Sequence, residues 1–145
     1  MYQHDTLYHL PDYLSVEKAD WYWPPADKTE TLVVVQDAQW QAAEQQTVEK
    51  LIQAIQQHKD NTAIVVLASN TVLPLGQWRH TLGFHKVIAL GPDAASMALQ
   101  VTLPDYTPLN MASFTIVRSD AVSLLNQHPK RKAALWAALQ HMYNV

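Results

Sequence analysis

Four short runs of apolar, largely β-branched residues recur along the chain, separated by stretches in which apolar residues follow a helical spacing. Unbroken apolar runs of this length are typical of strands that are covered on both faces, as in a parallel sheet. The pattern therefore predicts four strands in a mainly parallel sheet. These predicted strands are Thr31–Gln36, Ala63–Ala68, Lys86–Leu90 and Ser113–Val117.

Helices are predicted in the segments that connect these strands. Apolar residues recur at i, i+3, i+4 and i+7 from Val48, which predicts an amphipathic helix over residues 45–57. A shorter helix over Leu75–Phe84 is closed by Gly83, since glycine readily adopts the left-handed conformation of a helix cap. Strands that alternate with helices predict an α/β fold of three α/β/α layers around a mainly parallel four-stranded sheet. The remaining helical stretches are residues 94–100, residues 121–125 and a terminal helix from Pro129.

The length of 145 residues fits one folded domain, which we place at residues 31–145. Cysteine is absent, which excludes a disulfide scaffold, a thiolate zinc site and a cysteine nucleophile. The longest apolar run is far shorter than the roughly 18 residues that a membrane span needs. The N-terminus also lacks the basic start and apolar run of a signal peptide. We therefore expect a cytoplasmic protein with no membrane partner.

Residues 1–30 form a separate segment by composition. They carry six acidic and two basic residues, whereas the remainder carries seven acidic and eight basic residues. The same segment is rich in Tyr and Trp and contains three prolines but no glycine. Because disordered segments are usually poor in aromatic residues, this segment either packs on its own domain or anchors in a partner. The formal charge of −3 gives no sign of a basic surface for tight duplex binding.

Ligands of open α/β sheets bind at the carboxyl ends of the strands, and no familiar catalytic motif stands there. The turn after the first strand, residues 37–41, contains no glycine, which excludes a phosphate-binding loop of the usual kind. No serine lies in a Gly-x-Ser-x-Gly elbow, and no two histidines form a His-x-x-x-His pair. Asp93 and Asp120 are interpreted as helix N-caps. We therefore expect no catalytic residue, no metal and no cofactor.

Two segments resemble uracil-DNA glycosylases. Residues 85–100 are similar to the strand, turn and alanine-rich helix of that superfamily, and residues 114–142 to its final strand, loop and terminal helix. The loop after that last strand reads His-Pro-Ser in active glycosylases, whereas Arg118, Ser119 and Asp120 stand at the matching positions. The resemblance implies a glycosylase-like fold without the glycosylase reaction.

One family that combines this scaffold with lost chemistry is the psi subunit of the bacterial DNA polymerase III clamp loader. The segment from Arg131 to Leu139 resembles that family's terminal helix, which reads basic-x-Ala-Leu-Trp-x-x-Ile/Leu. The family's leader, Leu-Gly-Ile-x-x-Trp followed by Pro, is matched loosely by residues 14–16 and 21–24, with Ser15 at the glycine position. This resemblance implies a non-catalytic accessory subunit.

The resemblance also implies partners. The leader would dock on the gamma/tau motor subunit, and the folded body on the chi subunit, which contacts single-strand binding protein and through it DNA. Three basic residues in the first turn of the terminal helix are either a solvated face or a small contact for an acidic partner. The implied motor-subunit contacts are Leu14, Val16, Trp21, Tyr22, Trp23 and Pro24, and the basic residues are Lys130, Arg131 and Lys132.

Two other functions stay open from the sequence. The chain would be an active uracil or mismatch DNA glycosylase if residues such as Asp37, Asn70 or Asp120 carried an atypical mechanism. It would otherwise be an unrelated α/β interaction domain that binds neither clamp-loader partner.

Overall fold

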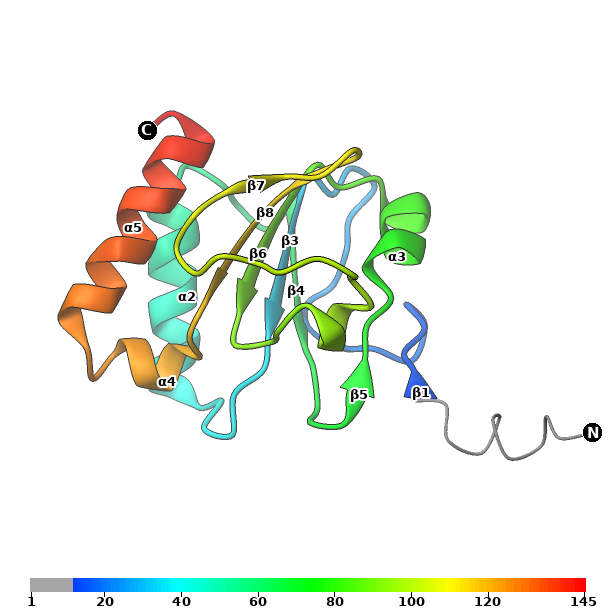
Figure 1. The fold of residues 1–145 in the computed structure, drawn as a ribbon, viewed down its shortest axis with the longest axis horizontal. Helices are drawn as coiled ribbons and strands as arrows, with labels where there is room; N and C mark the ends of the chain where they lie inside the picture. The colour runs from blue at the N-terminus through cyan, green and yellow to red at the C-terminus, as the bar shows by residue number, and fades with distance from the viewer. Residues whose placement is uncertain (1–11) are drawn as a thin grey trace, which may run out of the picture.

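A computed structural model describes residues 12–145, which form a mixed α/β structure around a six-stranded sheet (Figure 1). The strands are β1 (Asp12–Tyr13), β2 (Asp20–Trp23), β3 (Thr31–Val35), β4 (Thr62–Val66), β5 (Thr71–Val72), β6 (Lys86–Leu90), β7 (Leu109–Asn110) and β8 (Thr115–Ser119). The helices are α2 (Ala42–Ala54), α3 (Leu75–Leu82), α4 (Val122–Leu125) and α5 (Pro129–Tyr143), with a 3-10 turn, η1, at Ala95–Met97.

The sheet has the strand order β2-β4-β3-β6-β8-β7. Its four central strands are parallel to one another, while β2 runs antiparallel to β4 and β7 antiparallel to β8. The prediction of a four-stranded sheet is therefore wrong in the number of strands, because a short antiparallel strand extends the sheet at each edge. A separate two-stranded sheet joins β1 to β5 in parallel.

One face of the sheet is covered by α2, α4 and α5 (Figure 1). Val33 and Val35 of β3 lie on this face and pack with Val48 and Ile52 of α2 and with Leu139 of α5. All five side chains are at most 1% exposed. Full burial of an aliphatic side chain contributes about 1.5–3 kcal/mol, so this cluster is a major source of stability.

The opposite face carries α3, η1 and the segment that follows η1. Leu32 and Val34 of β3 lie on this face, because side chains alternate along a strand, and they pack with Trp78 of α3 and Met97 of η1. Since both faces are covered, β3 is buried at every position, as its unbroken apolar run predicted.

Several element boundaries agree with the sequence pattern. Strand β6 spans the predicted residues, and α5 begins at Pro129. Gly83 closes α3 in the left-handed conformation, with φ of 78°. Helix α2 starts three residues earlier than predicted, at Ala42, where the Gln41 N–H donates to the Glu44 carboxylate at 3.0 Å. This contact satisfies a donor that a helix start otherwise leaves unpaired.

The helix predicted over residues 94–100 is wrong, because only the single turn η1 forms there. The carbonyl of Ser96 accepts the N–H of Leu73 at 2.8 Å, so it is not available to continue a helix. Ala98 then ends the turn in the left-handed conformation, with φ of 55°. Within residues 12–145, no helix combines the length and the apolar character that a bilayer crossing requires.

Candidate functional site

The carboxyl ends of the parallel strands are the first place to look for a site. The strand that follows β3 in the chain, β4, lies on one side of it, and the next long strand, β6, lies on its other side. The position between β3 and β6 is therefore a switch point, where an open α/β sheet forms its ligand crevice. Here Gly91, directly after β6, adopts a φ of 115°, and a Cβ built on it would lie 2.2 Å from the Gln36 carbonyl oxygen. The two strand ends therefore meet backbone to backbone at this point.

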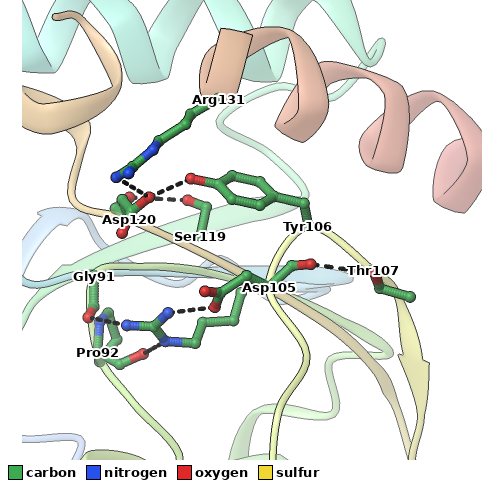
Figure 2. A network of polar contacts seen from close by, with 9 residues as sticks. Gly91, Pro92, Asp105, Tyr106, Thr107, Ser119, Asp120 and Arg131 are labelled. Carbon is green, nitrogen blue, oxygen red and sulfur yellow. Dashed lines mark hydrogen bonds and ion pairs between the residues drawn. The ribbon is translucent and has the colours of Figure 1, made fainter. Parts of the chain in front are cut away.

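Arg118 occupies the next position along this edge. Its Nε donates to the Pro92 carbonyl at 2.9 Å, its Nη2 donates to the Gly91 carbonyl at 3.2 Å, and its Nη1 pairs with the Asp105 carboxylate. Figure 2 shows these three acceptors lying close together. Strand β8 runs to Ser119, two residues beyond the predicted end, so Arg118 is part of the strand rather than of a loop. Its side chain is 20% exposed and ties β6, β8 and residue 105 together.

A second polar cluster surrounds Asp120 (Figure 2). The Tyr106 hydroxyl donates to Asp120 Oδ2, and Arg131 Nη1 of α5 donates to the same oxygen at 3.2 Å. The Ser119 hydroxyl donates to the Asp120 backbone carbonyl at 2.9 Å. Burial and the bond to Asp120 raise the pKa of Tyr106 to about 12. Asp120 therefore joins the loop before β7 to the start of α5, and it is not the helix N-cap that the sequence suggested.

Asp37 is held on the other side of the switch point. Its Oδ2 accepts the backbone N–H of Ser123 at 2.8 Å, and its Oδ1 accepts the Ser123 hydroxyl at 2.8 Å. The same Oδ1 accepts the N–H of Gln39 at 2.9 Å. A carboxylate that takes N–H groups in the first turn of a helix acts as a cap, and here Asp37 caps α4 from a distant loop.

Asn70 and Asp93 are the two other strand-end residues singled out from the sequence. Asn70 is exposed in the turn before β5, where it adopts a φ of 65°. Asp93 accepts the backbone N–H of Ser96 at 2.9 Å, which agrees with its interpretation as a cap. Hydrogen bonds from the Ser96 backbone and side chain lower the pKa of Asp93 below its ordinary value. In the part of the chain that the structure describes, no group of three or more His, Asp or Glu is placed to hold a metal ion.

The hydroxyl of Tyr106 gives a test of the polar cluster around Asp120. Tyr106→Phe is expected to lower the free energy of unfolding by about 1 kcal/mol at pH 7, because Asp120 loses a donor in a partly exposed site. The folded-state pKa of about 12 lies above the ordinary value of 10.0, so this stabilisation is complete below pH 10 and is lost as the pH rises through 12. Urea unfolding of both proteins at pH 7 and pH 11 measures the difference, with Tyr13→Phe as an exposed control. If the free energies of unfolding of the two proteins differed by the same amount at both pH values, the stabilising bond from the Tyr106 hydroxyl to Asp120 would be contradicted.

The aromatic segment before residue 31 packs, in its described part, on its own domain. Strand β2 forms one edge of the sheet, so the sheet continues across the boundary that the sequence suggested near Thr31. The pairing is irregular: Trp21 lies opposite Val65 and Trp23 opposite Ile64, which leaves Tyr22 as an extra residue. This β-bulge breaks the alternation of faces, so Tyr22 and Trp23 pack on the same side.

Residues ahead of the bulge pack on the α3 face. Leu14, Val16 and Trp21 are partly buried against the core cluster there. The Trp21 ring lies 5.4 Å from the ring of Trp78, and its Nε1 donates to the Val16 carbonyl at 3.1 Å. Trp78 Nε1 in turn donates to the Leu14 carbonyl at 2.9 Å. Three of the six predicted partner contacts are therefore internal packing residues in this structure.

The other three predicted partner contacts are Tyr22, Trp23 and Pro24, and they lie toward the α2 face of the sheet or in solvent. Tyr22 and Trp23 are stacked, with ring centroids 6.4 Å apart, and Trp40 meets Tyr22 edge-on at 5.3 Å. The Tyr22 hydroxyl donates to the Glu49 carboxylate, which raises the pKa of Tyr22 to about 12. Pro24, the next residue, is exposed.

The three basic residues at the start of α5 do not share one environment. Arg131 faces Asp120, as described above, while Lys132 Nζ donates to the Asn126 side chain at 3.2 Å. Lys130 is exposed and makes no ion pair within the described residues. The structure therefore does not bring the three together as a single patch.

Sequence reasoning missed Asp105, Tyr106, Trp40 and Glu49, which hold these clusters in place. Asp105 and Tyr106 lie in the proline-containing stretch that showed no periodicity, so no pattern indicated that they would face β8. Trp40 offered one signal, since a large aromatic residue in a turn usually packs against something. Compared with known proteins, the chain matches no protein-family model and no curated protein.

Proposed function

We propose that this protein is a non-catalytic accessory subunit of the bacterial DNA polymerase III clamp loader. It would link the gamma/tau motor subunit to the chi subunit, and thereby to single-strand binding protein and DNA, in the cytoplasm. The observation that carries the proposal is that the carboxylates at the strand-end edge bind groups of their own chain. Asp37, Asp105 and Asp120 each accept such contacts, which suits a scaffold better than an active site.

The proposed scaffold is a three-layer α/β/α fold related to uracil-DNA glycosylases. Four parallel central strands with helices over both faces support it. Arg118 stands where the resemblance would put the start of the catalytic loop, and its guanidinium is taken up by two carbonyls and Asp105. A glycosylase needs a pocket for a flipped base, so these internal contacts favour a non-catalytic scaffold.

The contact with the motor subunit is proposed for the outer edge of β2 and the residues around it. Leu14, Val16 and Trp21 would anchor the segment on its own domain, leaving Trp23 and Pro24 to meet the partner. An aromatic side chain that is already held in place loses little conformational entropy on binding, which favours it as an interface anchor. Strand β2 lies at the sheet edge, so a partner can approach it without unfolding the domain.

Trp23→Ala in the full-length chain is expected to weaken binding to the isolated gamma/tau subunit by about tenfold or more, because interface tryptophans often dominate affinity. Isothermal titration calorimetry measures the change, and circular dichroism checks that the variant is folded. A point substitution is preferable to removing residues 1–28, since that deletion would also remove β2 from the sheet. His141→Ala, on an exposed residue of α5 to which no contact is assigned, is the matched control.

Three results would contradict the proposal. The first is that the unaltered chain binds neither the gamma/tau nor the chi subunit, which would favour an unrelated interaction domain. The second is that Trp23→Ala and His141→Ala bind the motor subunit equally well, which would remove the role given to β2. The third is catalytic release of uracil from uracil-containing single-stranded DNA, which would favour an active glycosylase.

A further inference from the structure

A shallow groove of about 320 Å³ lies between α2 and the junction of α4 with α5. We call it the α2 groove; it is lined by Ala43, Gln46, Thr47, Lys50, Leu51 and Ala54 of α2, and by Asn126 and Lys132. The α2 residues recur every three or four positions, so they form one continuous face of the helix. Ala43, Leu51 and Ala54 give this face an apolar floor whose small side chains leave room for another chain.

The charges in the α2 groove are of one sign. Lys50 and Lys132 are its two charged lining residues, and neither makes an ion pair within residues 12–145. The two acidic residues of α2 are engaged elsewhere: the Glu44 carboxylate accepts the N–H of Gln41, and Glu49 accepts the Tyr22 hydroxyl. Neither carboxylate lines the α2 groove or forms an ion pair with Lys50 or Lys132, so both charged side chains of the groove itself are positive.

One of the two lysines is held in position by the protein. Lys132 Nζ lies 3.2 Å from Asn126 Oδ1, and the Thr47 hydroxyl lies 3.0 Å from the same oxygen. This contact links α2 to the α4–α5 junction across the groove and leaves other N–H donors of the ammonium unused, since Lys carries three. A pre-positioned cation beside an apolar floor costs a binding partner less ordering than a mobile surface lysine.

We propose that the α2 groove binds an acidic segment of another protein. Its carboxylates would pair with Lys50 and Lys132, and an apolar side chain would sit against Leu51. Complementary charge excludes basic partners and selects acidic ones, while the apolar floor supplies contact area. This inference stands apart from the proposed function, because it follows from the charge and shape of the groove and not from the identity of a clamp-loader subunit.

Site-specific photo-crosslinking in cells that produce the full-length chain tests the inference. A benzoylphenylalanine at Gln46, inside the groove, is expected to crosslink to one protein, and mass spectrometry of the crosslinked peptide should find an acidic stretch. The double substitution Lys50→Glu with Lys132→Glu is expected to reduce that crosslink by about tenfold or more. Lys18→Glu with Lys28→Glu, which makes the same charge change on exposed residues outside the groove, should leave it intact. Because the double substitution also removes the Lys132–Asn126 contact, Lys50→Glu is tested alone as well. Circular dichroism checks that each variant is folded.

The remaining outcomes count against the inference. A crosslinked peptide from this same chain would identify the groove as a self-association surface. A peptide without an acidic stretch, a crosslink to nucleic acid, or no crosslink at all would each overturn the charge argument. The same partner captured equally well from Gln53, on another part of α2, would show that the α2 groove is not the site. None of these results depends on whether the chain binds the gamma/tau subunit.

Discussion

Replacing Gly91 with alanine is expected to destabilise the folded protein by roughly 3–5 kcal/mol. The residue has a φ of 115°, which side chains other than glycine rarely adopt, and its Cβ would lie 2.2 Å from the Gln36 carbonyl oxygen. That oxygen belongs to backbone at the end of β3, so the clash cannot be relieved by rotating a side chain. Strands β3 and β6 would have to separate where the Gln36 N–H donates to the Leu90 carbonyl at 3.1 Å. Urea unfolding followed by circular dichroism measures the loss.

Gly76 provides the matched control for this substitution. It lies in α3, and a Cβ built on it meets no atom within 4 Å. Gly76→Ala is therefore expected to leave stability unchanged or raise it by up to about 1 kcal/mol, because alanine favours helix over glycine. If Gly91→Ala proved as mild as Gly76→Ala, the close approach of the two strand ends would be disproved.

Trp78→Ala is expected to lower the free energy of unfolding by about 3–5 kcal/mol, as is typical when a buried aromatic side chain is truncated. Trp78 is 2% exposed and packs in the core cluster that includes strands β3, β4 and β6. Its loss would also remove the donor to the Leu14 carbonyl and the ring that contacts Trp21. We therefore expect β2 and the residues before it to lose protection before the rest of the sheet.

Two measurements check this prediction. Urea unfolding gives the overall loss, and amide hydrogen exchange compares β2 with the central strands. Trp78→Phe is the control: it keeps an aromatic ring in the core but removes the indole N–H, so its cost is expected to be clearly smaller. Uniform loss of protection across the sheet in Trp78→Ala would show that Trp78 does not specifically hold the N-terminal segment.

The central strands could be predicted from the sequence because each carries its signal locally. Strand β3 is buried at every position, and a strand of that kind must be apolar throughout. The edge strands carry no such signal. Strand β7 has two residues, and β2 combines a charged residue with three aromatic ones across a bulge, so neither shows a regular alternation. Strand β2 pairs with residues more than 40 positions away, which no local pattern can indicate. Strand β7 lies close to its partner in the chain but is too short to show a strand pattern of its own.

The candidate site was predictable only as a location. The rule that strand ends carry ligands pointed to Asp37, Asp93 and Asp120, and the cap interpretation of Asp93 agrees with its bond to Ser96. The partners of the other two could not be read from spacing, since Ser123 is 86 residues from Asp37 and Tyr106 is 14 residues from Asp120. Arg118 directly follows the strand predicted at Ser113–Val117, yet it lies within β8, where carbonyls and Asp105 satisfy its guanidinium.

The sequence by itself determined the mixed α/β class, the four central strands and the helices that begin or end at Pro129 and Gly83. Hydrophobic periodicity and the backbone preferences of Pro and Gly act over a few residues, so they can be read from the chain directly. The tertiary structure decided which polar groups neutralise one another and which lysines of α2 and α5 keep their charge unpaired. Those outcomes depend on atoms brought within a few ångströms by the whole fold, and electrostatic contacts of that range exist only once the chain has folded.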